Sequence, residues 1–378
     1  MAGDGAQTTG VESPAVSICS PEVTATDAAS PLSDRPGSVR MDRRTAVHHG
    51  DPLREQRLLR EGLAVVDLSD RGVLTVTGPG RLTWLHSLTT QDLASLAPRE
   101  SAEAFVLTPQ GRIEHLLHLV DDGETTWITT EPGRAGALAT WLDSMRFMLR
   151  VEVAEVTDRH AVLGEPVGRP GAAGEPPTWV DPWPGPVGRT AVRTPEDLGE
   201  HPGAAWAWRE VIVPRDEVES WAGDRPLAGW WALEALRVEA WRPGWAEVDD
   251  RSIPHELDWL RTAVHLEKGC YRGQETVARV QNLGQPPRRL VFLHLDGSGH
   301  ELPAAGSEVR VGASPTEPGS GKVVGRLTSV ARHHELGPIG LAVVKRSTPA
   351  EEELSIGSVS AAQEVVVAVG GRPRRPRL

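Results

Sequence analysis

The residues best suited to chemistry in this chain of 378 residues lie in one short stretch, LEKGCYRGQETVAR, which spans positions 266–279. The chain has 40 Lys plus Arg, yet only three of these are lysines, and it has two cysteines and one tyrosine. Lys268, Cys270 and Tyr271 bring the three scarce residue types together within four positions. Lysine in a chain that otherwise uses arginine indicates a need for a compact ammonium here, with chance clustering as the alternative.

The spacing of Lys268 and Cys270 predicts a reactive thiol. In an extended segment both side chains point to the same face, because strand side chains have a period of two. An ammonium beside a thiol favours the thiolate, which is a better nucleophile and a better ligand for soft metals. Gly269 and Gly273 leave room for a ligand to approach the backbone closely. A buried, inert thiol is the alternative interpretation of Cys270 taken by itself.

The same region is an island of positive charge in an acidic chain. Between positions 268 and 289 there are five cations and one acid, Glu275, so the local net charge is +4. Such an island fits a small anionic ligand. The cations are Lys268, Arg272, Arg279, Arg288 and Arg289. The net charge of the whole chain is −12, which argues against a general nucleic-acid binder.

Cysteine usage and hydropathy indicate the cellular compartment in which the protein is expected. Cys19 and Cys270 cannot make a disulfide framework, and no C-x-x-C pair suggests a zinc site. The longest apolar runs are far shorter than the roughly 20 residues that span a bilayer. The start of the chain lacks the basic and apolar segments of a secretory signal. We therefore expect a cytoplasmic protein with no membrane contact, no direct nucleic-acid contact and no metal site.

The pattern along the chain predicts two folded regions between disordered ends. Residues 1–50 are rich in small and polar residues and are expected to form a disordered tail. Strand-like and helix-like runs alternate over 51–287, as is typical of an α+β domain, with a Gly- and Pro-rich loop or insertion at 164–188. Five short β-rich runs over 288–370 predict a small barrel or sandwich, and 371–378 is a basic tail.

KGCYRGQE, at positions 268–275, matches the K-G-C-Y-x-G-Q-E signature of the YgfZ family. On this signature the chain resembles these folate-binding relatives of the glycine-cleavage aminomethyltransferases. Weaker matches extend the resemblance over roughly residues 60–365. They are TGPGRLTWLHSLTTQDL, PQGRI, EALRVEAWRPGW and the stretch 249–257. In the third of these, Trp241 stands where many relatives carry glycine.

The resemblance implies both a fold and a ligand. The family fold consists of ferredoxin-like α+β subdomains around a central folate-binding hole, followed by a C-terminal β-barrel. The implied cofactor is tetrahydrofolate or a derivative, whose pterin amino group and ring N–H would donate to Glu239. Trp241 and Trp245 are close enough in sequence to Glu239 to stack on the pterin. The residues expected at the folate are Glu239, Trp241, Tyr271, Arg272, Gly273, Gln274, Glu275 and Arg279. The glutamate tail of the folate would pair with Arg272, Arg279, Arg288 or Arg289.

A second stretch separates this chain from the catalytic relatives. The aminomethyltransferases carry a G-G-I-L-D-D-L type segment whose acid helps to activate the folate, whereas this chain reads GRIEHLL at 111–117. His115 and Leu116 replace the paired aspartates, and on a strand Glu114 would face the side opposite to His115. General-acid help of about 10²–10⁴-fold would be lost. We therefore expect folate binding without the parent reaction.

Three functions remain open. The first is a tetrahydrofolate-binding accessory factor that supports assembly or repair of iron–sulfur enzymes, such as those that modify tRNA, with Cys270 and Lys268 as the reactive pair. Its partners would be folate and iron–sulfur enzymes or their assembly proteins. The second is a folate-dependent one-carbon (aminomethyl) transferase in which His115 or Glu114 replaces the missing acid. The third is a non-enzymatic scaffold whose pocket is a relic.

Overall fold

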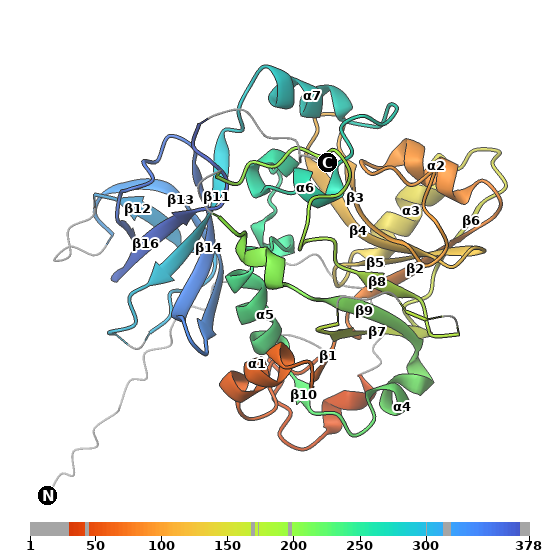
Figure 1. Cartoon of the computed structure of the whole chain (residues 1–378), viewed down its shortest axis with the longest axis horizontal. Helices are drawn as coiled ribbons and strands as arrows, with labels where there is room; N and C mark the ends of the chain where they lie inside the picture. Colours follow the sequence, from red (N-terminus) through yellow and green to blue (C-terminus); the bar gives the residue numbers. More distant parts are fainter. Residues whose placement is uncertain are drawn as a thin grey trace, which may run out of the picture.

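A computed structural model of the chain describes residues 30–41, 45–167, 171–172, 174–195, 199–299, 301–312 and 319–370. Over these residues the chain forms two five-stranded sheets and a closed six-stranded barrel (Figure 1). The barrel lies at one side of the molecule, and the two sheets lie beyond helix α5, Trp230–Glu239. The predicted fold class, mixed α and β elements followed by a C-terminal β-barrel, is confirmed.

The first sheet has the strand order β10-β1-β7-β9-β8. β1 pairs in parallel with β10, and the other neighbours pair antiparallel. Every residue of β7 after the first is buried, which fits its central place in the sheet and its small and branched side chains. The strands are β1 Val65–Asp67, β7 His160–Glu165, β8 Thr178–Val180, β9 Arg209–Pro214 and β10 Leu227–Ala228.

The second sheet has the order β3-β4-β5-β2-β6 and is antiparallel throughout. Its strands are β2 Gly72–Thr77, β3 Ser101–Leu107, β4 Ile113–Asp121, β5 Thr125–Thr130 and β6 Glu152–Glu155. Helices α2, Arg81–Leu88, and α3, Ala135–Met145, share one apolar cluster with it, which contains Leu74, Leu85 and Leu138. The turn between β3 and β4 contains Gly111 at φ +77°, a backbone conformation that favours glycine.

The barrel closes in the order β11-β14-β13-β12-β15-β16, so its strands leave no open edge. Its interior holds side chains such as Val291, Leu293 and Leu327. Arg288, the first residue of β11, donates to Asp249 Oδ2 at 2.6 Å and to Glu256 Oε2 at 2.7 Å, which ties the barrel to the preceding region. The strands are β11 Arg288–Leu295, β12 Glu308–Val311, β13 Lys322–His333, β14 Gly337–Lys345, β15 Leu354–Ile356 and β16 Val359–Val365.

Helix α5 connects the two halves of the molecule, because it packs against β13 and β14 of the barrel and against β1 of the first sheet. Helix α1, Pro52–Arg60, packs beside it. Among the described helices, none combines the length and apolar character that crossing a membrane requires. The other helices are η1 Pro31–Asp34, η3 Pro202–Ala205, η4 Arg215–Glu217, α4 Val218–Ala222, η5 Trp245–Glu247, η6 Pro254–Leu257, α6 Leu260–Ala263 and α7 Gln274–Asn282.

Two segments differ from the sequence-based expectation. Part of the expected 1–50 tail is structured: Leu32 is buried with the first sheet, and Ser30 Oγ donates to Asp67. Apolar residues such as Val47 are buried against the domain, and their burial stabilises this segment. The largely polar composition of the segment did not indicate this. The expected loop at 164–188 contains strand β8, which pairs with β9. Residues 1–29 and 371–378 lie outside the described residues.

Candidate functional site

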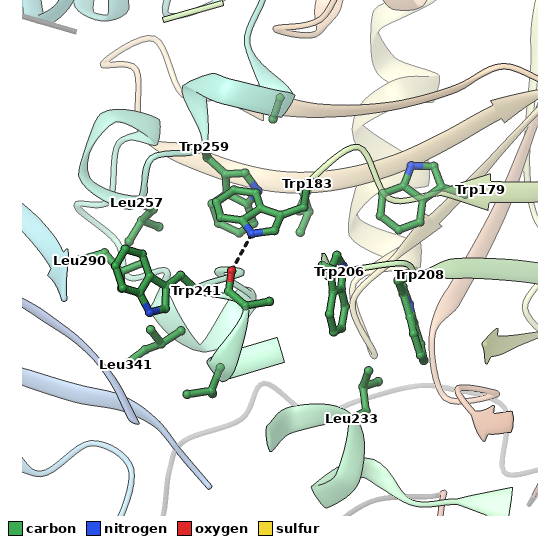
Figure 2. Close-up of a cluster of buried hydrophobic side chains, with 14 of the residues drawn as sticks. Trp179, Trp183, Trp206, Trp208, Leu233, Trp241, Leu257, Trp259, Leu290 and Leu341 are labelled. Carbon is green, nitrogen blue, oxygen red and sulfur yellow. Dashed lines mark hydrogen bonds between the residues drawn. The ribbon is translucent and has the colours of Figure 1, made fainter. Parts of the chain in front are cut away.

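A cavity of about 450 Å³ lies where the two sheets meet helix α5 and strand β13 of the barrel. Its described lining includes a tryptophan pair, Trp206 and Trp208, whose ring centroids are 5.6 Å apart with planes 24° apart. The His118 ring stacks on Trp179 at 3.6 Å, nearly parallel. Figure 2 shows Trp179, Trp206 and Trp208 with Leu233 beneath the pair. Six tryptophans line the cavity: Trp179, Trp206, Trp208, Trp230, Trp231 and Trp245.

Arg242 supplies the first buried cation of this cavity. Its Nε donates to Asp181 Oδ2 at 2.9 Å, and its Nη2 donates to Glu103 Oε1. Trp206 Nε1 donates to the same Asp181 oxygen at 2.8 Å, so this carboxylate is already engaged. Burial alone would lower the pKa of Arg242, but Asp181 and Glu103 outweigh it and raise the pKa. The cavity wall is therefore a fixed ion-pair network.

Arg71 supplies a second cation, between two carboxylates. Its guanidinium lies 3.4 Å from both Glu210 and Glu131. Glu210 also accepts from Thr129 Oγ1 at 2.8 Å and contacts His118 Nδ1 at 3.2 Å. Burial alone would raise the pKa of Glu210, but Arg71 and His118 outweigh it and hold the pKa at about 2. Glu131, 17% exposed, has the Arg71 contact as its one ion pair among the described residues.

Arg237, on α5, forms the third network. It donates to both oxygens of Glu234, at 2.8 and 2.6 Å, and to Glu247 Oε2 at 3.0 Å. Burial alone would lower the pKa of Arg237, but these two carboxylates raise it. Arg134 stacks on Trp245, with its guanidinium carbon 4.0 Å from the ring centroid. Such a cation–π contact fixes the indole at the edge of the cavity.

Two buried donors on the lining side chains have no partner among the described residues: Arg71 Nε and Arg242 Nη1. Buried N–H groups are costly when left unpaired, so a ligand with acceptor atoms gains by pairing with them. Indole faces beside such donors suit a flat heterocycle that carries polar edges. The residues present therefore fit a pterin-like group. Among the described residues, no group of His, Cys, Asp or Glu side chains is arranged to hold a metal ion.

The predicted reactive segment lies elsewhere, at the start of α7. Lys268 Nζ donates to the backbone oxygens of His86, Thr89 and Gln91, at the C-terminal end of α2. Burial lowers the pKa of Lys268 to about 8. The Tyr271 ring is buried, with its centroid 5.3 Å from Nζ. The ammonium therefore closes a helix end, where cations are favourable, instead of pairing with a thiol.

Cys270 is exposed, whereas Lys268 is buried, so the two side chains do not share a face as an extended segment would require. The segment is a turn and not a strand, because Gly273 adopts φ +83° and begins α7. A Cβ on Gly273 would lie 2.5 Å from Thr108 O, so close backbone packing explains this glycine. The described lining of the tryptophan cavity includes none of residues 266–279.

The remaining polar residues of the segment have partners near the surface. Arg272 pairs with Glu114 at 3.1 Å, and Glu275 pairs with Arg279 at 3.1 Å on the exposed face of α7. Gln274 Nε2 lies 3.5 Å from Lys268 O. Of the proposed tail partners, Arg288 is held by Asp249 and Glu256, and Arg289 is buried with Thr348 O and Gln363 as acceptors. Three of the five cations of the positive island are thus paired with carboxylates of the chain.

The structure also separates Glu239 from the tryptophan cavity. Glu239 ends helix α5, where it pairs with Arg60 and lines a different cavity. Glu234 lies five residues earlier on the same helix and lines the tryptophan cavity. At 3.6 residues per turn, side chains five positions apart point about 140° apart, which explains the difference from the expectation.

Trp241 and Trp245 follow α5 and have different positions. Trp241 is 2% exposed, packs against Phe292 of the barrel and is absent from the described lining, whereas Trp245 lines the cavity. Trp241 has φ +55°, a helix-ending conformation in which glycine is the usual residue. This agrees with glycine at the matching position of many relatives.

On strand β4, Leu116 and His118 line the cavity, and His115 does not belong to the described lining. Burial, reinforced by Arg134 and Arg272, lowers the pKa of His115 to about 4, so its ring is neutral at pH 7. At position 116, β4 therefore presents an apolar side chain to the cavity instead of the aspartate of the G-G-I-L-D-D-L type segment. Glu114 is engaged with Arg272.

Sequence reasoning missed most of the cavity residues, including Trp179, Trp206, Trp208, Arg71 and Glu131. They come from separate strands and loops and form no motif. Composition was the available signal, because 13 tryptophans accompany three phenylalanines and one tyrosine.

Comparisons with known proteins agree with this architecture. No family model matches the chain. The chain is 26% identical over 315 residues to a chloroplastic protein of Arabidopsis thaliana named as a transferase, covering 75% of this chain and 66% of that protein. It is 26% identical over 306 residues to an aminomethyltransferase of Symbiobacterium thermophilum, covering 75% of this chain and 78% of that enzyme.

Among solved structures, the chain resembles the glycine cleavage system aminomethyltransferase T from Bartonella henselae. The TM-score is 0.68 at 18% identity, covering 92% of this chain and 98% of that one, which shows a common fold. Together these matches show that the chain is similar in sequence to aminomethyltransferases over about three quarters of its length and shares the fold of the Bartonella henselae protein.

Proposed function

We propose that the chain binds tetrahydrofolate or a derivative in the tryptophan-lined cavity. The observation that carries this proposal is the combination of six indoles with two unpartnered buried guanidinium donors. A pterin is flat and stacks well on indole, and its oxygen and ring nitrogens accept hydrogen bonds. The volume of about 450 Å³ lies within the range of about 300–1,000 Å³ that small ligands occupy.

Glu131 is the carboxylate best placed to accept from the pterin's amino group and ring N–H. The other cavity acids are more strongly engaged: Glu210 and Asp181 accept hydrogen bonds from neighbouring side chains, and Glu234 accepts two from Arg237. Glu131 retains its acceptor capacity and is the most exposed of the four acids that form ion pairs with Arg71 or Arg242. A planar two-donor edge meeting a carboxylate gives strong, directional hydrogen bonds.

Calorimetric titration with tetrahydrofolate, under anaerobic conditions, tests this proposal. We expect saturable binding, weakened at least about tenfold by Glu131→Gln, because an amide cannot accept both donors. The matched control is Glu124→Gln, an exposed residue in the turn that precedes β5, which should bind like the unmodified chain. Absence of saturable heat from folded protein would remove the folate site.

We further propose that the folate-bound chain supports iron–sulfur enzymes through Cys270. The supporting observation is that this thiol is exposed and separate from the described cavity lining, so a partner can reach it while folate is bound. Iron–sulfur clusters usually take four thiolates, so any cluster ligation would be shared with a partner, a second copy or a small thiol.

In a deletion strain complemented with Cys270→Ala, we expect lower activity of cluster-containing enzymes such as tRNA methylthiotransferases. Tetrahydrofolate affinity should stay unchanged. Normal activity of these enzymes in the complemented strain would exclude a central role for the thiol.

A folate-dependent one-carbon transferase is the second candidate, favoured by the names of the aminomethyltransferases that the chain resembles. Leu116 in the cavity argues against it, because strand β4 then has no carboxylic acid at this position to act as a general acid. Turnover of aminomethyl or N-methyl donors by purified protein with tetrahydrofolate would favour this candidate. We expect none above the background of a heat-denatured sample.

A further inference from the structure

A second cavity, which we call the rear chamber, shares a wall with the tryptophan cavity. Its volume is about 270 Å³, and Trp206 and Trp208 line both spaces. Leu59 and Leu236 contribute further apolar surface, together with prolines and alanines from the segments around 166 and 202–207. This volume lies just below the range that drug-sized ligands occupy, so the rear chamber suits a group about the size of one apolar side chain.

One side of the rear chamber is charged. Among its described lining residues, Arg60 and Glu239 are the charged ones, and they end helices α1 and α5, which pack together. Arg60 Nη2 donates to Glu239 Oε2, and His333 Nε2 lies 3.3 Å from the same oxygen. His333 Nδ1 accepts the backbone N–H of Leu336 at 3.1 Å, so in the neutral ring Nε2 carries the hydrogen and donates to Glu239.

Both charges remain able to bind a further partner. Glu239 Oε1 makes no hydrogen bond to a described residue, and the Glu239 side chain is 28% exposed. The Arg60 side chain is 42% exposed, and a guanidinium has five N–H donors, more than its contacts with Glu239 and Glu335 require. An arriving molecule can therefore use one acceptor and several donors without breaking the existing pair.

We propose that the rear chamber binds a small zwitterion with an apolar body, namely a free α-amino acid with an apolar side chain. Its ammonium donates to Glu239 Oε1, its carboxylate accepts from Arg60, and its side chain lies against Leu59, Leu236 and the tryptophan pair. Glu239 would repel a simple anion, and Arg60 would repel a simple amine. A ligand that carries both charges is therefore preferred. This site is additional to the proposed folate site and shares only the Trp206–Trp208 wall.

In the proposed site Glu239 recognises the ammonium of the amino acid and takes no part in folate recognition. The side chain that the L-x-x-E-A run singles out is directed away from the tryptophan cavity by the helical geometry of α5. Its contacts with Arg60 and His333 hold it in a single orientation at the mouth of the rear chamber.

Calorimetry of the full chain with L-leucine as the probe tests the proposal. We expect saturable binding, and at least about tenfold weaker binding of N-acetyl-L-leucine, L-leucinamide and glycine, which lack the ammonium, the carboxylate charge and the apolar body respectively. Arg60→Gln and Glu239→Gln should each weaken L-leucine binding at least about tenfold. The matched control is Arg57→Gln, which removes an exposed arginine one turn earlier on α1 and should change nothing.

Three outcomes would overturn the proposal. One is the absence of saturable binding for L-leucine, L-isoleucine, L-valine and L-phenylalanine in protein that is folded by circular dichroism. A second is equal binding of L-leucine and its N-acetyl derivative, since the ammonium would then have no partner. A third is weaker tetrahydrofolate binding in Arg60→Gln and Glu239→Gln, which would make the chamber part of the folate site. Failure of the folate proposal is detected separately, in the Glu131→Gln titration.

Discussion

In the segment 266–279 nearly every polar side chain has a hydrogen-bond or ion-pair partner within the protein. The tryptophan cavity instead contains buried donors that have no such partner among the described residues. Lys268 reaches three carbonyl oxygens, and Arg272 reaches Glu114. In the cavity, Arg71 Nε and Arg242 Nη1 are buried without a described partner. The two regions therefore have different capacities for a ligand, although the first has the more unusual composition.

Scarce residues can therefore mark a packing constraint as readily as a reactive site. The ammonium of Lys268 binds carbonyl oxygens at the end of α2, and Gly273 packs against Thr108. Both contacts fix the turn that leads into α7. Ligand capacity instead follows from enclosure, flat apolar walls and unsatisfied donors.

Arg242→Met should have the largest effect on stability. It leaves Glu103 and Asp181 buried without their cation, and loss of one partner of a buried pair costs about 3–5 kcal/mol. Urea unfolding followed by circular dichroism measures the loss. Arg279→Met is the control, because its pair with Glu275 is exposed and should contribute less than about 0.5 kcal/mol. Equal effects of the two variants would show that the cavity network is not structural.

Lys268→Met should lower the free energy of unfolding by about 2–3 kcal/mol, because three carbonyl oxygens at the end of α2 lose a charged donor. Lys322→Met, at an exposed position of the barrel, should stay within about 0.5 kcal/mol. The same urea experiment compares them. A stable Lys268→Met variant would return this lysine to the list of candidate reactive groups.

Gly273→Ala should cost about 2 kcal/mol, since the residue has φ +83° and a new Cβ would lie 2.5 Å from Thr108 O. Gly269→Ala is the natural control, because a Cβ there meets no atom within 4 Å and the backbone is not left-handed. Tetrahydrofolate affinity should be unchanged in both variants. Loss of affinity in Gly273→Ala alone would connect the segment to the folate site and weaken the comparison.

Much of the fold could be predicted from the sequence. The alternation of strand-like and helix-like runs expected over 51–287 appears in elements such as β3, β4 and α3. These elements follow from local periodicity, which the sequence displays directly. The closed barrel follows from short β-rich runs separated by Gly and Pro.

The site was harder to predict, because it depends on which face of an element meets a cavity. Glu239 was expected at the folate, but only tertiary packing decides that Glu234 faces the tryptophan cavity and Glu239 the rear chamber. Trp206 and Trp208 lie between elements, where no period exists to place them. Glu131 and Arg71 meet only after the second sheet has formed.

Cys270→Ala should have the smallest effect on the isolated protein. The thiol is exposed, so its removal should change the free energy of unfolding by less than about 0.5 kcal/mol and leave folate affinity unaltered. The rate of maleimide labelling at Cys270, followed by peptide mass spectrometry at low temperature, should agree within about twofold between the unmodified chain and Lys268→Met. This follows because the ammonium is committed to α2 carbonyl oxygens. A labelling rate about tenfold lower in Lys268→Met would show that the lysine activates the thiol after all, and the segment would then join the cavity as a region with chemistry of its own.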